Sequence, residues 1–336
     1  MKSLDFRHYV LGGFAAAALL AGCGALPLSL SKGQSDTQPP IGAPSAMRQS
    51  RAIATHAERS RSWMLPEAKS EDLLYVSDYQ NGVIVLSYTP PRLKYVGFLS
   101  EPQWGEGECV DKAQNVFITG SAYDIVEYAH GATTPKAILT DPFALPLSCS
   151  VDPTTGNLAV VGYPDQFHKI YGAAIFKKAR GKPTLYEDTG FAAFACTYDN
   201  EGNLFLDGSL TSSVAIAKLQ KGSSTFTNIP LEQSFNAVGG IQWDGQYVAV
   251  GDYYNAVIYE FEINGSSATK VGSTPLGGSG TVLQFFIDRG RVIVPSTFQN
   301  YSGFVKIFDY PAGGAAKRTH DVGSPNGTVV SRARRH

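Results

Sequence analysis

Methionine, tryptophan and histidine are scarce in this chain of 336 residues, which holds 3, 3 and 6 of them. The charges nearly cancel, because 28 Lys and Arg stand against 29 Asp and Glu and the net charge is −1. No basic excess is available to neutralise a phosphate backbone, so we expect no nucleic-acid partner. The low methionine content beside 35 glycines and 19 prolines argues against a helix bundle and is typical of turn-rich β proteins.

The local motifs of common enzyme classes are also missing. The chain has no Gly-x-Ser-x-Gly elbow, P-loop, His-Glu-x-x-His or dinucleotide fingerprint, and no Cys-x-x-Cys pair for zinc or thiol chemistry. His130, His168 and His320 have no obvious nucleophile beside them in the sequence, and we expect them to lie on the surface. The sequence therefore gives no local indication of catalytic chemistry.

The N-terminal segment has the pattern of a targeting signal. Lys2 and Arg7 flank the start of an apolar stretch over residues 9–20, which is too short to span a bilayer as a helix. It ends in Leu20-Ala21-Gly22-Cys23, which resembles the bacterial lipobox. The resemblance implies that residues 1–22 are a lipoprotein signal peptide and that Cys23 is lipidated. The protein would then be extracytoplasmic and lipid-anchored to the bacterial cell envelope, in the periplasm or at the cell surface. An ordinary secretory signal with a chance cysteine is the alternative.

The next segment is polar and has no apolar period. It is rich in Gly, Ser, Gln and Pro with scattered Arg, a composition typical of a disordered tether. We therefore divide the chain into a signal peptide (1–22), the lipidated cysteine with its tether (23–60) and a folded domain (61–336). No segment after the signal approaches about 18 uninterrupted apolar residues, so the lipid is the one membrane contact we expect.

The folded domain repeats itself with a period of roughly 44 residues. In each repeat a short apolar strand ends near an aspartate, a turn follows, and a second apolar strand begins. These aspartates follow one another at intervals of 41, 47, 45 and 44 residues and are Asp111, Asp152, Asp199, Asp244 and Asp288. A third strand and a more variable fourth strand complete each unit. The pattern predicts an all-β, six-bladed β-propeller with four-stranded blades, with seven blades as the alternative.

The two ends of the domain are complementary. Residues 73–78 match the second strand of the other units, so the first unit lacks its innermost strand, and residues 325–331 look like an innermost strand without partners. We expect the C-terminal strand to close the ring, which removes an exposed edge. Residues 63–66 are the competing candidate for that gap, and otherwise Trp63 packs near the rim of the ring.

The blades over residues 72–334 resemble NHL-type and gluconolactonase-like (regucalcin-type) propellers, and a group of uncharacterised bacterial lipoproteins with such blades. The resemblance implies a divalent metal at one channel mouth. Two family motifs are matched, one at Glu106-Gly107-Glu108 and one at Pro325-Asn326-Gly327. Glu106 and Asn326 would be ligands, as oxygen donors for a hard cation. The corresponding positions in the other blades cannot bind a metal, and they are Leu147, Phe194, Gly239 and Leu283. A metal-dependent lactonase-like hydrolase is therefore kept as the alternative function, and we otherwise expect no cofactor.

Aromatic residues are concentrated in the loops that join second and third strands. In a propeller these loops share one face with the starts of the innermost strands, so the rings would gather on one side of the disc. They are Tyr79, Tyr123, Tyr163, Phe167, Tyr253, Tyr254, Phe298 and Tyr301. Exposed Tyr and Phe offer large, rigid contact areas. The alternative is that several of these rings fold inward and pack between blades.

Two further residue sets have structural interpretations. Asp78, Asp207 and Asp252 end second strands, where we expect turn residues rather than an acidic rim. Cys109, Cys149 and Cys196 fall on predicted innermost strands. An oxidising envelope permits one disulfide, but strands of neighbouring blades are usually too far apart for one, so we expect buried small apolar residues.

The leading hypothesis is a non-catalytic binding or scaffolding module, anchored to the envelope, that holds a protein segment or a glycan on its aromatic loop face. The partners we expect are the membrane, through the N-terminal lipid, and an envelope protein or glycan ligand. A structural subunit of an envelope complex is the second alternative, and a contiguous apolar patch on the rim would favour it.

Overall fold

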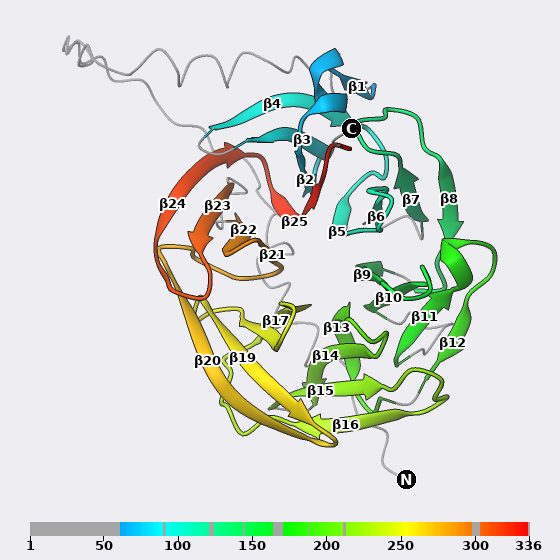
Figure 1. The fold of residues 1–336 in the computed structure, drawn as a ribbon, viewed down its shortest axis with the longest axis vertical. Helices are drawn as coiled ribbons and strands as arrows, with labels where there is room; N and C mark the ends of the chain where they lie inside the picture. Colours follow the sequence, from blue (N-terminus) through cyan, green and yellow to red (C-terminus); the bar gives the residue numbers. More distant parts are fainter. Residues whose placement is uncertain are drawn as a thin grey trace, which may run out of the picture. The chain divides into compact units, whose positions relative to one another are not determined.

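Four-stranded antiparallel units recur along the chain. The computed structural model describes residues 61–334 except 90–91, 121–123, 144, 164–170, 188, 211–212 and 298–302, all within one compact unit, Ala54–His336. The strands of these residues form five sheets, one of which has eight strands and joins two repeats. The described residues thus hold six repeats around a common centre (Figure 1), consistent with a β-propeller. None of their helices is long and apolar enough to cross a membrane.

Each repeat has its first strand at the centre and its fourth at the rim (Figure 1). The strands of repeats 2, 3 and 4 are β5 (Gly105–Val110), β6 (Val116–Gly120), β7 (Asp124–Tyr128), β8 (Ala137–Thr140), β9 (Leu145–Val151), β10 (Leu158–Tyr163), β11 (Ala173–Phe176), β12 (Thr184–Tyr186), β13 (Ala192–Tyr198), β14 (Leu204–Leu210), β15 (Ser213–Leu219) and β16 (Phe226–Pro230). Two short 3-10 helices, η2 (Pro66–Ser70) and η3 (Lys177–Ala179), lie between strands.

Repeats 5 and 6 follow the same order. Their strands are β17 (Val238–Trp243), β18 (Val248–Asp252), β19 (Val257–Asn264) and β20 (Ser267–Gly277) in repeat 5, and β21 (Phe286–Asp288), β22 (Arg291–Thr297), β23 (Gly303–Asp309) and β24 (Gly313–Val322) in repeat 6. Repeat 1 has five strands, from the centre outward β25 (Pro325–Ser331), β2 (Leu73–Asp78), β3 (Gly82–Thr89), β4 (Arg92–Leu99) and β1 (Trp63–Met64). The outer strands β20 and β24 pair in parallel through Leu276 with Gly314 and Gly277 with Ala315, which joins repeats 5 and 6. The sequence did not predict this pairing.

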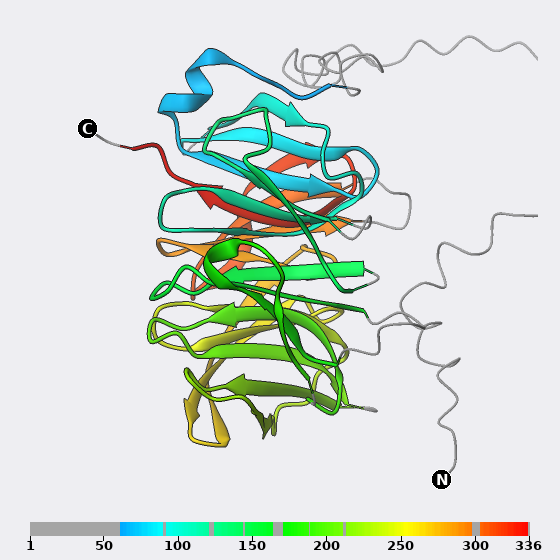
Figure 2. The same cartoon turned by 90° about the vertical axis from the view of Figure 1, so that its right-hand side faces the viewer.

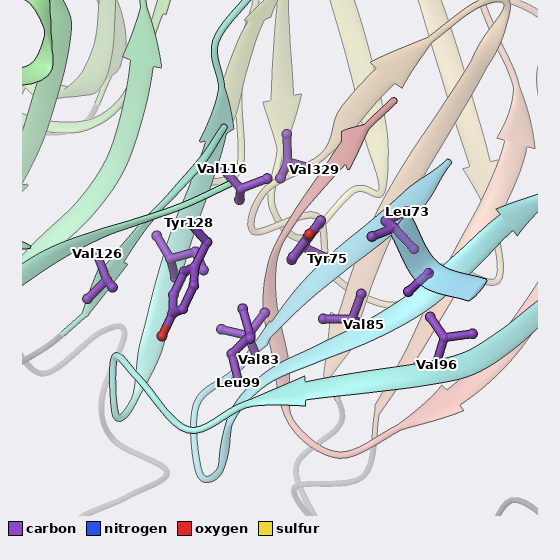
Figure 3. Close-up of a cluster of buried hydrophobic side chains, with 12 residues drawn as sticks. Leu73, Tyr75, Val83, Val85, Val96, Leu99, Val116, Val126, Tyr128 and Val329 are labelled. Atoms are coloured by element: carbon purple, nitrogen blue, oxygen red, sulfur yellow. The ribbon is translucent and has the colours of Figure 1, made fainter. Parts of the chain in front are cut away.

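The core consists of apolar layers between neighbouring repeats. Among the described residues there is one such layer for every neighbouring pair, including repeats 6 and 1. Figure 3 shows the layer between repeats 1 and 2, where Tyr75 and Val85 meet Val116 and Tyr128 beside Val329 of β25. Because both faces of a repeat are covered, its second strand is buried without alternation, as in β2, in which every residue is buried, Ser77 and Asp78 included.

Four of the five repeated aspartates cap the turns between first and second strands, whereas Asp288 binds Arg332. Asp199 accepts hydrogen bonds from the backbone N–H of Asn203 at 2.9 Å and from its side-chain amide at 2.7 Å. Asp111 and Asn115 form the same pair in repeat 2, with both distances at 2.7 Å. The spacing that identified the repeats in the sequence therefore reflects one turn chemistry used again and again.

The C-terminal strand closes the ring, as predicted. β25 pairs antiparallel with β2, with Leu74 opposite Val330 and Tyr75 opposite Val329. The competing segment lies elsewhere, since β1 pairs with β4 on the outer side of repeat 1. Trp63 packs there edge-on against Tyr95, with ring centroids 5.2 Å apart. The prediction that Trp63 packs near the rim is confirmed.

The residues after β25 fix the closure. Arg332 forms ion pairs with Asp72 at the start of repeat 1, at 2.6 Å, and with Asp288 of repeat 6. Its guanidinium also lies over the ring of Tyr88, 5.6 Å from the centroid. His130 of repeat 2 contacts the Ser331 hydroxyl at 2.7 Å. His130 is therefore part of the closure, and the expectation that it is a plain surface residue is wrong.

Cys109 and Cys149 form a disulfide between repeats 2 and 3, which corrects the expectation of three unpaired cysteines. Their Cα atoms are 5.7 Å apart, within the usual range for a bridge. The first strands come this close because Gly107 has no side chain, and a Cβ there would lie 2.3 Å from the carbonyl oxygen of Leu147. Cys196 is free and buried.

Removing this bridge tests the contact between repeats 2 and 3. We expect the Cys109→Ala/Cys149→Ala variant to lose about 2–4 kcal/mol of unfolding free energy, the usual range for a disulfide. Denaturant titration with and without reductant measures the loss. The wild-type chain should lose stability on reduction, whereas the variant should not respond. Cys196→Ala is the matched control and should keep the full reductant response. Alkylation of Cys109 and Cys149 in the non-reduced, unfolded wild-type chain would contradict the bridge.

Candidate functional site

One face of the ring receives the starts of the first strands and the turns between second and third strands. In repeat 2 the register places Gly105 of β5 beside Gly120 of β6, and Gly120 beside Asp124 of β7. These three strand ends therefore lie at the same end of the sheet. Each fourth strand leads into the next first strand at that end, so the same face is kept around the ring. Figure 2 shows the strands running across the disc from one face to the other.

Exposed aromatic side chains gather on this face. Tyr79, Trp104, Tyr163 and Tyr254 are 39%, 50%, 39% and 52% exposed. The other large apolar side chains that are exposed in the described residues are aliphatic and lie on outer strands, namely Ile138, Leu185 and Val271 on β8, β12 and β20. Rings and aliphatic groups are thus segregated. We call the surface formed by Tyr79, Trp104, Tyr163, Tyr253 and Tyr254 the aromatic face.

The structure places part of the predicted set and adds one residue. Tyr79, Tyr163, Tyr253 and Tyr254 lie on this face. The other four predicted residues, Tyr123, Phe167, Phe298 and Tyr301, lie outside the described residues. Trp104 was missed because it precedes a first strand, whereas the predicted set came from the loops between second and third strands. A tryptophan directly before the Gly-Glu-Gly run of β5 was the available signal.

The tyrosines of repeats 1 and 5 are held by the same turn. Asp78 accepts a hydrogen bond from the N–H of Gln80 at 2.8 Å, and the N–H of Tyr79 donates to Ser324 O at 2.9 Å. In repeat 5, Asp252 accepts from Asn255 Nδ2 at 2.9 Å, and the N–H of Tyr253 donates to Ala237 O at 3.0 Å. Asp78 and Asp252 are turn residues, as predicted. Both turns project tyrosines from a backbone that is hydrogen-bonded to the residue just before the first strand of the same repeat.

Ring contact and backbone conformation further define two places on the aromatic face, the Tyr253–Tyr254 pair and Trp104. Tyr253 and Tyr254 meet edge to face with centroids 4.6 Å apart. Trp104 has φ +52°, in the left-handed region that non-glycine residues seldom adopt. Such backbone conformations are concentrated at functional sites. The half-exposed indole of Trp104 is thus presented from a left-handed backbone position, which five other non-glycine residues of the described chain also adopt.

Glu106 and Asn326 come together at the mouth of the ring, as the sequence motifs implied. Asn326 Nδ2 donates to Glu106 Oε2 at 2.9 Å, across the boundary between repeats 1 and 2. Burial raises the pKa of Glu106 to about 8, and the Asn326 bond opposes this shift. Burial also raises the pKa of Tyr163, and the nearby Glu106 charge adds to that effect. Repeats 1 and 2 thus make contact here, and Tyr163 of repeat 3 lies close enough for the Glu106 charge to affect its pKa.

A glutamine crosses the ring at the same level. Gln284, just before β21 of repeat 6, donates through Nε2 to Leu147 O of repeat 3 at 2.9 Å. Repeats 3 and 6 are three places apart in a ring of six, so this side chain spans the centre. The Gln284 side chain therefore crosses the mouth of the ring, and the hydrogen-bonded pair of Glu106 and Asn326 lies at its edge.

The mouth does not fit the divalent-metal centre implied by the gluconolactonase-like resemblance. Glu106 and Asn326 supply two side chains, whereas calcium takes about 6–8 oxygen ligands. No group of three or more His, Cys, Asp or Glu side chains suited to a metal occurs among the described residues. Leu147 contributes its backbone carbonyl to Gln284 instead. We assign no metal-dependent step to these residues.

Two other carboxyl groups are buried near the first strands. Asp207 lies inside β14 and accepts from the N–H of Ala195 at 2.8 Å, so the prediction that it is a turn residue is wrong. Glu108 lies between repeats 1 and 2, where neither carboxyl oxygen has a hydrogen bond of good geometry among the described residues and the backbone N–H of Val329 offsets only part of its burial. Burial raises the pKa of both carboxyl groups well above the ordinary range.

Comparison with known proteins supports the fold and leaves the function open. No family model matches the sequence, and no curated protein matches it. The fold is similar to the crystal structure of a protein of unknown function from Bacteroides caccae. The TM-score is 0.57 at 12% identity, over 78% of this chain and 100% of that chain. This likeness shows an all-β, multi-sheet fold and carries no activity with it. Membership of the NHL-type or gluconolactonase-like group stays a prediction.

The buried Glu108 predicts a particular pH dependence of stability. Its pKa is raised in the folded state, whereas the unfolded chain titrates near the ordinary value of about 4.3. The unfolded state therefore holds fewer protons above that pH, and folding stability falls as the pH rises through this window. We expect Glu108→Gln to be more stable than wild type at pH 7–8, with the gain vanishing toward about pH 4.

Denaturant titrations over this pH range measure the effect. Glu232→Gln, at an exposed loop position, is the matched control and should leave the pH profile unchanged. A Glu108→Gln variant that is less stable than wild type at pH 8 would contradict the burial of a destabilising charge.

Proposed function

We propose that this chain is a lipid-anchored, extracytoplasmic six-bladed β-propeller that acts as a non-catalytic binding module through its aromatic face. The segregation of exposed rings carries the proposal, since Tyr79, Trp104, Tyr163 and Tyr254 share one face while exposed aliphatic residues occupy the rim. Tyr and Trp provide large contact areas with few torsions to immobilise and are enriched among residues that dominate binding energy.

The support beneath the rings favours binding. The turns at Tyr79 and Tyr253 are held by aspartate caps and by backbone bonds to Ser324 and Ala237. A contact surface that is already ordered loses less conformational entropy when a ligand arrives. The arrangement therefore suits recognition without rearrangement.

The anchor follows from Cys23 and the segment after it. A tether of about 37 residues would have an r.m.s. span of roughly 30–37 Å, enough to hold the propeller off a lipid surface. The described chain begins beside the aromatic face, where the Ser62 and Ser100 hydroxyls are 3.1 Å apart just beyond the end of β4. Membrane fractionation tests the anchor, because Cys23→Ala should move the protein to the soluble fraction and a membrane-bound variant would contradict it.

Paired substitutions test the face itself. We expect Trp104→Ala/Tyr254→Ala to lose most binding on printed arrays of glycans and peptides, because two half-exposed rings on the proposed contact surface are removed. The measurement uses the full chain purified in detergent, with melting curves to show that each variant is folded.

The rim supplies the control. Ile138→Ala/Leu185→Ala removes two apolar side chains of comparable exposure from outer strands and should leave array binding unchanged. Equal binding by the aromatic and rim variants would overturn the assignment of the aromatic face.

A further inference from the structure

The apolar groups exposed on the aromatic face are rings. Trp104 and Tyr254 are about half exposed there, while Ile138, Leu185 and Val271 are exposed only on the rim. A flat ring matches the C–H face of a pyranose, and a sugar stacks on it without needing a groove. The exposed rings of this face therefore suit a sugar.

The mouth also offers no free strand edge. The first strands pair with the second strands on one side, and on the other side they approach their neighbours backbone to backbone. A Cβ at Gly107 would lie 2.3 Å from Leu147 O, and one at Gly327 would lie 2.4 Å from Glu106 O. An extended peptide cannot add a strand where the edges are already this close.

Planar polar groups occupy the centre of the face. Gln284 and Asn326 are half-buried, and each uses its amide nitrogen within the ring, on Leu147 O and on Glu106 Oε2. Their amide oxygens have no hydrogen-bond partner among the described residues. These oxygens are fixed acceptors for hydroxyl groups. Binding sites commonly combine apolar contact surface with a few such convergent polar groups.

The charges on this face favour an uncharged ligand over an anionic one. The described loops of the face, including residues 79–81, 100–104, 231–237, 253–256 and 278–285, contain no Lys or Arg. An anionic polymer would therefore find no counter-charge in these loops. The polar groups at the centre are the side-chain amides of Gln284 and Asn326 and the buried carboxyl group of Glu106, which accepts a hydrogen bond from Asn326.

We infer that the aromatic face binds an uncharged glycan, with sugar rings stacked on Trp104 and Tyr254 and hydroxyl groups donating to Gln284 and Asn326. This inference rests on the proposed function and names its ligand class. An acidic glycan would require basic groups that these loops lack. The loops do carry the exposed carboxylates of Glu101 and Glu232, so a basic peptide is the competing ligand that the test includes.

Calorimetric titration of the full chain in detergent tests the ligand class. The probes are cellohexaose, xylohexaose, mannohexaose and chitohexaose as neutral glycans, hexagalacturonate as an acidic glycan, and hexalysine as a basic peptide. We expect at least one neutral hexasaccharide to bind, and neither charged probe to bind comparably. Trp104→Ala should weaken the binding roughly tenfold or more, as expected for a central aromatic contact. Trp104→Phe should keep most of the affinity, because it keeps a ring.

Tryptophan fluorescence gives an independent readout. The chain has three tryptophans, and the indole nitrogens of Trp63 and Trp243 are buried, whereas Trp104 is 50% exposed. A stacked sugar should protect Trp104 from acrylamide quenching. Gln284→Ala should weaken binding without removing this protection, since the stacking ring remains, and melting curves show whether the ring stays closed.

The outcomes separate this inference from the proposed function. Binding of hexalysine or of peptide spots, lost in Trp104→Ala/Tyr254→Ala, would leave the binding face in place and overturn the glycan. Neutral glycan binding that survives Trp104→Ala would also overturn the inference. No binding by any neutral probe at millimolar concentration, with array binding equal in aromatic and rim variants, would overturn both.

Discussion

The pairing of β25 with β2 joins the end of the chain to the start of its described part and connects repeat 6 with repeat 1. Each repeat is covered on both faces by its neighbours, so an open ring would expose the apolar layers on either side of repeat 1 to water. It would also expose the backbone edge of β2. Arg332 reinforces the closure by binding both Asp72 and Asp288. The other interfaces depend on this pairing, because it keeps all six repeats in one ring.

Closure also creates the candidate site. It brings the start of β25 beside the start of β5, which is why Asn326 meets Glu106. It sets repeats 3 and 6 opposite each other, so that the Gln284 side chain crosses the mouth and donates a hydrogen bond to Leu147 O. The aromatic rings then surround a mouth that contains the side-chain amides of Gln284 and Asn326 and the buried carboxyl group of Glu106. The proposed binding function is thus a consequence of ring geometry, and no single repeat contains the site.

The repeats, the closing strand and the meeting of Glu106 with Asn326 could be predicted because each depends on local turn chemistry or on the order of repeats. The disulfide could not, since its formation depends on how closely Gly107 lets two backbones approach. Gln284 was missed because its partner lies across the ring, 137 positions away in sequence. Trp104 was missed because it lies in the loop before a first strand, whereas the aromatic residues were sought in the loops between second and third strands. Long-range contact thus accounts for the first two of these differences.

Native-state hydrogen exchange of β25 tests the closure most directly. If the pairing with β2 holds the ring together, the amides of residues 328–331 that are hydrogen-bonded to β2 should exchange only through global unfolding. They should exchange as slowly as the hydrogen-bonded amides of β14, the second strand of repeat 4. Exchange of these amides at the rate of an unstructured chain, while β14 stays protected, would show that the ring is stable without β25. Closure by the C-terminal strand would then not be the constraint on which the other interfaces depend.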